Sequence, residues 1–144
     1  MFNSFMPQGI GLTPSYISHP LWRPVSLQRA ADLWTQGAMF VDARDPGHYK
    51  KSHIRRAMNL SPMEIEHLYP LLKPSFQAAK EIVVYGRSFS HYPAAEIGQF
   101  LRQQGFEDVW VMDASLDDWR MAGYAVRQPK RLRSGNADGA EAGS

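Results

Sequence analysis

Short apolar segments alternate with segments of helical pattern over most of this chain. The apolar segments span residues 39–41, 57–60, 82–85 and 109–112. The run at 82–85 is continuous and rich in β-branched residues, which is typical of a strand buried on both faces. The pattern therefore predicts four short strands separated by helices.

Capping residues mark the boundaries of the predicted helices. Ser26 precedes a helix that runs to Gln36, and Gly37 ends it. Asp45 followed by Pro46 is typical of a helix start. That helix is expected to run from Pro46 to about Lys51. A further helix should follow a capping box formed by Ser61 and Glu64. The last two helices are expected from 93 to 104, with Gly105 as the stop, and from 116 to 121.

This alternation of strands and helices predicts an α/β domain with a parallel sheet covered by helices. In such sheets the site lies beyond the carboxyl ends of the strands, and the loop that starts at Gly86 begins at such an end.

Residues 1–24 form a Pro-rich N-terminal arm whose proline and glycine density excludes regular helix or central strand. Leu21 and Trp22 are expected to pack on the domain. Residues 25–127 form the domain, and 128–144 are expected to be a disordered tail.

Composition narrows the classes of function. The chain has 144 residues, 44% of them hydrophobic, and a formal net charge of +2. This charge is too small to indicate a nucleic-acid-binding surface. It contains no cysteine, which excludes disulfides, thiolate metal sites and thiol catalysis. The five histidines show no metal spacing, and no cofactor is expected. No signal-peptide pattern or membrane-length apolar run is present, so we expect a cytoplasmic protein without membrane contact.

An ordered set of residues between about 25 and 127 carries a family resemblance. Its members are Asp42-Ala43-Arg44, Tyr49, His53, Ile54, Ala57, Asn59, Val83-Val84-Tyr85, Ala94, Ala95, Leu116, Trp119, Gly123, Tyr124 and Val126. At these spacings the chain resembles the rhodanese-like (sulfurtransferase) domain family. The resemblance implies a three-layer α/β fold with a central, mainly parallel sheet flanked by helices.

The departures from that family cluster at its active-site loop. The family loop runs from a cysteine through four residues to a basic residue. Here the loop reads Gly86, Arg87, Ser88, Phe89, Ser90 and His91. Gly86 therefore stands at the position of the nucleophile, and sulfur transfer needs a thiolate. Further departures are Ser52 and Arg56 where glycine is usual, Ala114-Ser115 in place of a Gly-Gly pair, and His48 where Glu is frequent.

A loop that precedes a helix can still direct N–H groups at an anion. The candidate anion-binding residues are Arg55, Arg56, Arg87 and His91. The competing interpretation is that the three arginines are solvated surface charges and that Phe89 fills the pocket. A serine nucleophile at Ser88 or Ser90 lacks an orienting acid, and Ser90 is better explained as a helix cap. By resemblance, Asp42 and Arg44 form a structural turn and ion pair at the sheet edge, and His53 is a packed structural residue.

The favoured hypothesis is a catalytically inactive rhodanese-like domain that acts as a binding or regulatory module. Its partner is an unknown protein or a small anion. The alternative is a sulfurtransferase-family enzyme that handles a sulfur- or phospho-anion without a cysteine nucleophile. A third hypothesis is a structural domain that binds its partner on an outer face. The sequence names neither the ligand nor the oligomeric state.

Overall fold

A five-stranded sheet with the order β1-β6-β5-β2-β4 forms the centre of the molecule, and every neighbouring pair in it is parallel. The computed structural model describes residues 21–87 and 92–129. The predicted loop residues Ser88, Phe89, Ser90 and His91 lie outside this range. The sheet strands are β1 (Arg23–Val25), β2 (Met39–Asp42), β4 (Met58–Asn59), β5 (Ile82–Tyr85) and β6 (Val109–Met112).

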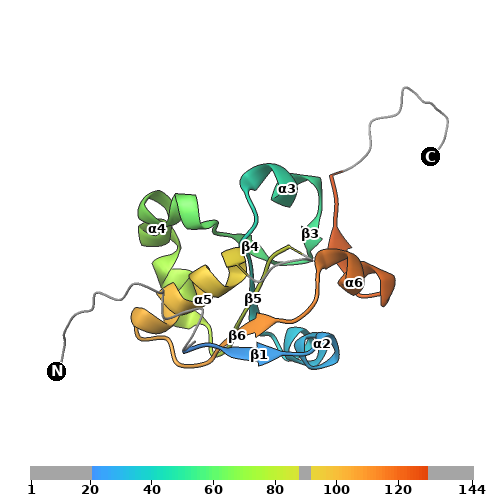
Figure 1. Cartoon of the computed structure of the whole chain (residues 1–144), viewed down its shortest axis with the longest axis horizontal. Helices are drawn as coiled ribbons and strands as arrows, with labels where there is room; N and C mark the ends of the chain where they lie inside the picture. Colours follow the sequence, from blue (N-terminus) through green and yellow to red (C-terminus); the bar gives the residue numbers. More distant parts are fainter. Residues whose placement is uncertain (1–20, 88–91, 130–144) are drawn as a thin grey trace.

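Helices cover both faces of the sheet, which confirms the predicted three-layer α/β architecture (Figure 1). Along β2, Phe40 packs with α2 and α6, while the next residue, Val41, packs with α4 and α5. Val83 and Val84 of β5 divide between the two faces in the same way. The helices are α2 (Leu27–Thr35), α3 (Pro46–Lys51), α4 (Ile65–Ala78), α5 (Tyr92–Gln103) and α6 (Leu116–Met121). No helix in the described ranges has both the length and the apolar character needed to cross a membrane.

The predicted helix caps at Ser26 and Asp45 are confirmed. The Ser26 side chain accepts a hydrogen bond from the Arg29 N–H at 3.1 Å, and Asp45 accepts one from the His48 N–H at 3.1 Å. The glycine stop after α2 is also confirmed, because Gly37 has a φ of +96°.

The capping box predicted at Ser61 and Glu64 is wrong. The Ser61 side chain makes no capping bond, and residues Pro62–Glu64 form a 3-10 turn, η1, before α4. In this turn the Ser61 carbonyl accepts the Glu64 N–H at 2.9 Å, so the serine hydroxyl is not needed there. A capping box does occur at α6, between Ser115 and Asp118.

The N-terminal boundary at residue 25 is crossed by a strand that sequence reasoning did not predict. Strand β1 begins at Arg23 and pairs with β6 at the sheet edge, where a proline such as Pro24 is tolerated. Trp22 packs against the α4/α5 side of the core, as expected, and the Leu21 N–H donates to Gln99 at 3.1 Å. At the other end, β7 (Val126–Arg127) pairs antiparallel with β3 (His53–Ile54). Residues 130–144 of the predicted tail lie outside the described range.

A buried carboxylate joins the carboxyl ends of the strands. Asp42, at the end of β2, has 0% exposure, and the Tyr85 hydroxyl at the end of β5 donates to it at 2.7 Å. The same hydroxyl accepts the N–H of Ile54 in β3 at 2.9 Å. Asn59, at the end of β4, donates to the Asp42 carbonyl at 3.0 Å. Burial, together with the Asp42 charge, raises the pKa of Tyr85, so its hydroxyl stays a donor.

Arg56 occupies a left-handed backbone conformation, with a φ of 72°. Its guanidinium carbon lies 3.9 Å from the centre of the Trp34 ring, and its side chain donates to the Trp34 carbonyl at 2.7 Å. The Trp34 indole in turn donates to the Arg55 carbonyl at 2.9 Å. The contacts to α2 offset a backbone strain that glycine would not incur.

Replacing Tyr85 by Phe tests the buried carboxylate network. We expect the free energy of unfolding to fall by about 2 kcal/mol, because Asp42 loses a donor and Ile54 loses an acceptor in the interior. Urea denaturation measures the change. Tyr69→Phe is the matched control, since Tyr69 packs against Phe100 and its hydroxyl has no hydrogen bond to the described residues. Equal stabilities of the Tyr85→Phe and wild-type proteins would contradict the prediction.

A pair of variants at Arg56 separates its side-chain contacts from its backbone strain. Arg56→Ala loses the ring contact but keeps the strain, and we expect it to lower the free energy of unfolding by about 1 kcal/mol. Arg56→Gly loses the same contact but relieves the strain, so it should be about 1 kcal/mol more stable than the alanine variant. Thermal unfolding of both variants measures the difference. An alanine variant as stable as the glycine variant would show that the backbone carries no strain.

Candidate functional site

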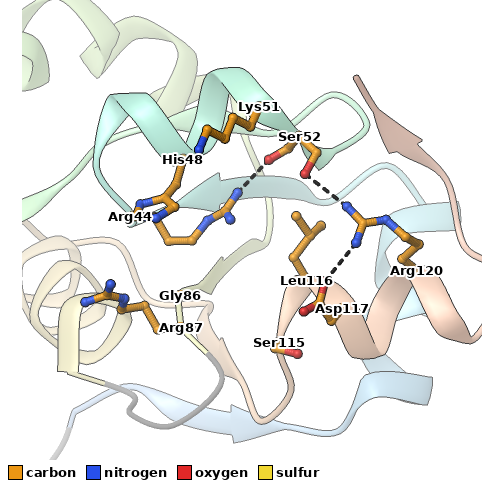
Figure 2. Close-up of a pocket in the computed structure, with 10 residues that line it drawn as sticks. All are labelled: Arg44, His48, Lys51, Ser52, Gly86, Arg87, Ser115, Leu116, Asp117 and Arg120. Carbon is orange, nitrogen blue, oxygen red and sulfur yellow. Dashed lines mark hydrogen bonds and ion pairs between the residues drawn. The ribbon is translucent and has the colours of Figure 1, made fainter. Parts of the chain in front are cut away.

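A pocket of about 380 Å³ lies where the carboxyl ends of β2 and β5 meet the N-terminus of α6. This basic pocket is where an open parallel sheet is expected to hold its site. Figure 2 shows its side chains, which come from α3, α6 and the ends of the strands. The lining residues are Arg44, His48, Lys51, Ser52, Gly86, Arg87, Ser115, Leu116, Asp117 and Arg120.

Arg44 forms the inner wall of the basic pocket and is held by Asp42. The two groups make an ion pair at 2.7 Å, and the Arg44 side chain is 13% exposed. Arg44 also donates to the Ser52 carbonyl at 2.6 Å. Burial tends to lower the pKa of Arg44, but the hydrogen bond and charge of Asp42 outweigh it, and the pKa is raised. The expected ion pair is thus confirmed, and it also faces the pocket.

Arg120 closes the opposite side of the basic pocket. It pairs with Asp117 at 2.7 Å and donates to the Ser52 hydroxyl at 3.0 Å. Figure 2 shows Arg44 and Arg120 reaching Ser52 from two sides of the pocket. A glycine at position 52 could receive only the first of these bonds, so the serine adds a link between α6 and the end of α3.

Two cations of the basic pocket, Lys51 and Arg87, form no ion pair with the described residues. Asp42 offsets Arg44 and Asp117 offsets Arg120, whereas no carboxylate in the described part of the chain lies within ion-pair distance of Lys51 or Arg87. Both of these side chains belong to exposed residues. The pocket therefore has a positive potential that favours an anionic group.

Gly86 lies at the floor of the basic pocket, against the start of α5. A side-chain carbon built there would lie 3.3 Å from the ring of Pro93 and 3.4 Å from the Ala94 nitrogen. These contacts are tight but need only small adjustments. The φ of Gly86 is outside the left-handed region, so the backbone does not require glycine. Position 86 could therefore hold a side chain such as that of cysteine after small adjustments, but this chain has glycine there.

A second pocket of about 500 Å³ adjoins the first and shares Arg44, His48 and Arg87 with it. Its lining is mostly apolar, and we call it the apolar pocket. Asp45 stands at its edge, and the pKa of this carboxyl is lowered by the His48 N–H, by the His48 side chain and by the charge of Arg87. The other lining residues are Ala43, Ser61, Pro62, Met63, Tyr92, Pro93 and Glu96.

The structure brings together only part of the predicted site. Gly86 and Arg87 line the basic pocket, but Arg55 and Arg56 line neither pocket. Arg56 is held against Trp34 of α2 instead, which is the physical reason that it does not reach the site. The anion-binding role predicted for His91 and the loop positions Ser88, Phe89 and Ser90 falls outside the described residues.

The structural role expected for His53 is consistent with its contacts. Its ring stacks on Tyr49 with centres 3.8 Å apart, and its Nδ1 lies 2.8 Å from the Tyr49 carbonyl oxygen.

Sequence reasoning did not single out two residues of the basic pocket, Lys51 of α3 and Arg120 of α6. One signal pointed to that side of the site, namely Ser115, which replaces a family glycine and caps the helix that carries Arg120.

Comparisons with known proteins agree with this architecture. A model of the rhodanese-like domain family matches residues 26–122. The thiosulfate sulfurtransferase GlpE of Pseudoalteromonas translucida is 32% identical over 102 residues, which cover 70% of this chain and 91% of that protein. GlpE of Pseudomonas entomophila is 28% identical over 117 residues, which cover 81% of this chain and 97% of that protein.

Solved structures show the same fold. The solution structure of a rhodanese-like domain from Anabaena has a TM-score of 0.59 at 24% identity, over 83% of this chain and 90% of that one. A protein of unknown function from Rhodopseudomonas palustris, described as a possible tyrosine phosphatase, has a TM-score of 0.64 at 22% identity, over 85% and 99% of the two chains. At such identities the likeness concerns the fold alone. Taken with the family match over residues 26–122, the carboxyl-end site and the aligned relatives, these findings show that the chain belongs to the rhodanese-like domain family.

Proposed function

We propose that this chain is a catalytically inactive rhodanese-like domain that binds an anionic group of a partner in its basic pocket. One observation carries the proposal: Gly86 stands at the position of the nucleophile, in a pocket where neither Lys51 nor Arg87 forms an ion pair with the described residues. The domain has kept the attraction for an anion and lost the atom that would react with it. A cytoplasmic binding or regulatory module is the role that fits this combination.

The inactivity follows from the chemistry of sulfur transfer. A thiolate must attack the outer sulfur of the donor and keep it as a persulfide. Gly86 has no atom that can form this bond, and the chain contains no cysteine that could replace it. The activity named for the GlpE relatives therefore does not pass to this chain.

The binding role follows from electrostatics. Arg44 and Arg120 are fixed by hydrogen bonds to Ser52, so the walls of the basic pocket are ordered before a ligand arrives. The first turn of α5 lies against Gly86, with the Ala94 nitrogen close to it. Cations and helix N-termini both favour negative charge.

Two other functions compete with this proposal. An enzyme that acts on a sulfur- or phospho-anion without a cysteine would also use the cations of the basic pocket. Turnover of thiosulfate and cyanide by the wild-type protein would support that alternative. A structural domain that uses an outer face would bind its partner equally well after changes at Lys51 and Arg87.

Anion titration followed by amide NMR tests the proposed function. We expect inorganic phosphate, sulfate and thiosulfate to cause saturable shifts at Ser52, Gly86 and Ser115, with affinity that falls as ionic strength rises. Lys51→Met should weaken phosphate binding about fivefold, because an exposed charge pair contributes up to about 1 kcal/mol. The control is Lys73→Met, which removes an exposed lysine of α4 away from both pockets. Amide resonances around the pocket that stay unmoved at millimolar phosphate would refute anion binding.

A single cysteine placed at position 86 reports the electrostatics of the pocket directly. The Gly86→Cys thiol would lie beside the start of α5 and near Arg44 and Arg87, so we expect its pKa to fall below the usual value of about 8.5. The pH dependence of alkylation by iodoacetamide measures this pKa. Because the natural chain has no cysteine, the reaction reports only the introduced thiol. Ser75→Cys on the exposed side of α4 is the control, and equal pKa values in the two variants would contradict the prediction.

A further inference from the structure

The basic pocket and the apolar pocket adjoin each other but differ in charge. They share Arg44, His48 and Arg87 as a common wall. On the basic side, Lys51 and Arg87 form no ion pair with the described residues, although the charge of Arg87 acts on the Asp45 carboxylate at longer range. On the apolar side, the carboxylates of Asp45 and Glu96 are both present. A ligand that spans the wall therefore meets a positive region and then a region with negative groups.

Glu96 provides the main evidence for an occupant of the apolar pocket. Its Oε1 is buried and has no hydrogen-bond partner among the described residues. A buried carboxylate oxygen without a donor is costly, and such exceptions in native proteins call for an explanation. Glu96 lies on α5, one turn after Tyr92, and belongs to the lining of the apolar pocket. Because Glu96 lines the apolar pocket, a cation that enters this pocket would offset the charge of its carboxylate.

The walls of the apolar pocket indicate what should carry that donor. Pro62, Met63, Tyr92 and Pro93 line it, and two of these are unusually exposed for large hydrophobic residues, Met63 at 91% and Tyr92 at 53%. A group with an apolar stem and a cationic tip matches such a site. Lysine and arginine side chains have this form, because their methylene groups pack on apolar surface while the charge reaches a partner.

The volumes of the two pockets favour a ligand larger than a free anion. Pockets of about 380 and 500 Å³ both fall in the usual range of about 300 to 1,000 Å³ for organic ligands. Both are open at the surface and lie side by side, so an extended chain can cross from one to the other. In an extended peptide, alternate side chains point the same way and lie about 7 Å apart. Side chains at positions i and i+2 can thus enter neighbouring pockets.

We propose that the two pockets together bind an extended segment of a partner protein that carries a phosphorylated side chain and, two residues away, a lysine or arginine. The phosphoryl group occupies the basic pocket, and the basic side chain lies along Met63 and Tyr92 and pairs with the charge of the Glu96 carboxylate. A phosphate of roughly −1.5 to −2 charge matches Lys51 and Arg87, the two pocket cations that form no ion pair with the described residues. This inference rests on the proposed function, because it names the partner class of the same anion site.

Fluorescence anisotropy with short labelled peptides tests the proposal. The probes are acetyl-Ala-pSer-Ala-Lys-Ala-amide, the same peptide with alanine in place of lysine, and the same peptide without phosphate. We expect the lysine phosphopeptide to bind about five- to tenfold more tightly than the alanine phosphopeptide, as one charge pair at a partly buried carboxylate allows. The peptide without phosphate should bind weakest of the three.

Variants of the protein assign the preference to Glu96. Glu96→Gln should remove the discrimination between the lysine and alanine phosphopeptides without weakening the binding of inorganic phosphate, because it removes a negative charge from the neighbouring pocket. Glu66→Gln, on the exposed side of α4, is the matched control and should keep the discrimination. Circular dichroism of each variant verifies the fold.

The outcomes separate this inference from the proposed function. Phosphate binding in the basic pocket, with equal affinity for the lysine and alanine phosphopeptides, would overturn the peptide proposal and leave anion binding intact. Discrimination that survives Glu96→Gln would also overturn it. Absence of any phosphate binding would overturn the proposed function, and the peptide proposal with it.

Discussion

The buried carboxylate of Asp42 is the constraint on which the site depends. A charged group with 0% exposure is tolerated in a protein interior only when donors surround it. Here Tyr85 and Arg44 supply those donors, and each belongs to a different part of the site. Tyr85 fixes the end of β5, directly before Gly86, and Arg44 forms the wall of the basic pocket. The need to satisfy one buried charge therefore sets the position of both the floor and the wall.

The loss of the nucleophile did not remove this framework. Asp42, Arg44 and Ser52 remain linked by hydrogen bonds, and Arg120 is joined to the same serine. These groups support the site without taking part in a covalent step, so a domain can lose the reacting atom and still keep a shaped, charged pocket. The cations around Gly86 are the observation on which the proposed binding role rests.

Much of the fold could be predicted because its signals are local. Ser26 and Asp45 begin helices through bonds to residues three positions away, and the run at 82–85 is apolar enough to require burial. Strand β1 was missed because its surrounding prolines argue against a strand, although a sheet edge tolerates them. The two-residue strands β3 and β7 were missed because they exist only through pairing with each other, more than 70 residues apart in the chain.

The candidate site was predicted only in part, because some of its residues have local signals and others reach it through tertiary contacts. Gly86 and Arg87 follow a strong strand signal, whereas Lys51 and Arg120 reach the pocket through tertiary packing. Arg56 was misassigned because its capture by Trp34 has no signal in the sequence.

The double attachment of Ser52 has a kinetic consequence. Because Arg44 and Arg120 already hold this residue from two sides, the pocket needs little rearrangement when an anion enters. Binding to a preformed, positively charged surface proceeds at a high association rate through long-range attraction. The lifetime of the complex is then set by the dissociation rate, to which contacts away from the anion contribute most. In the proposed binding role, such a domain would release most charged partners quickly and retain the one whose neighbouring side chains fit.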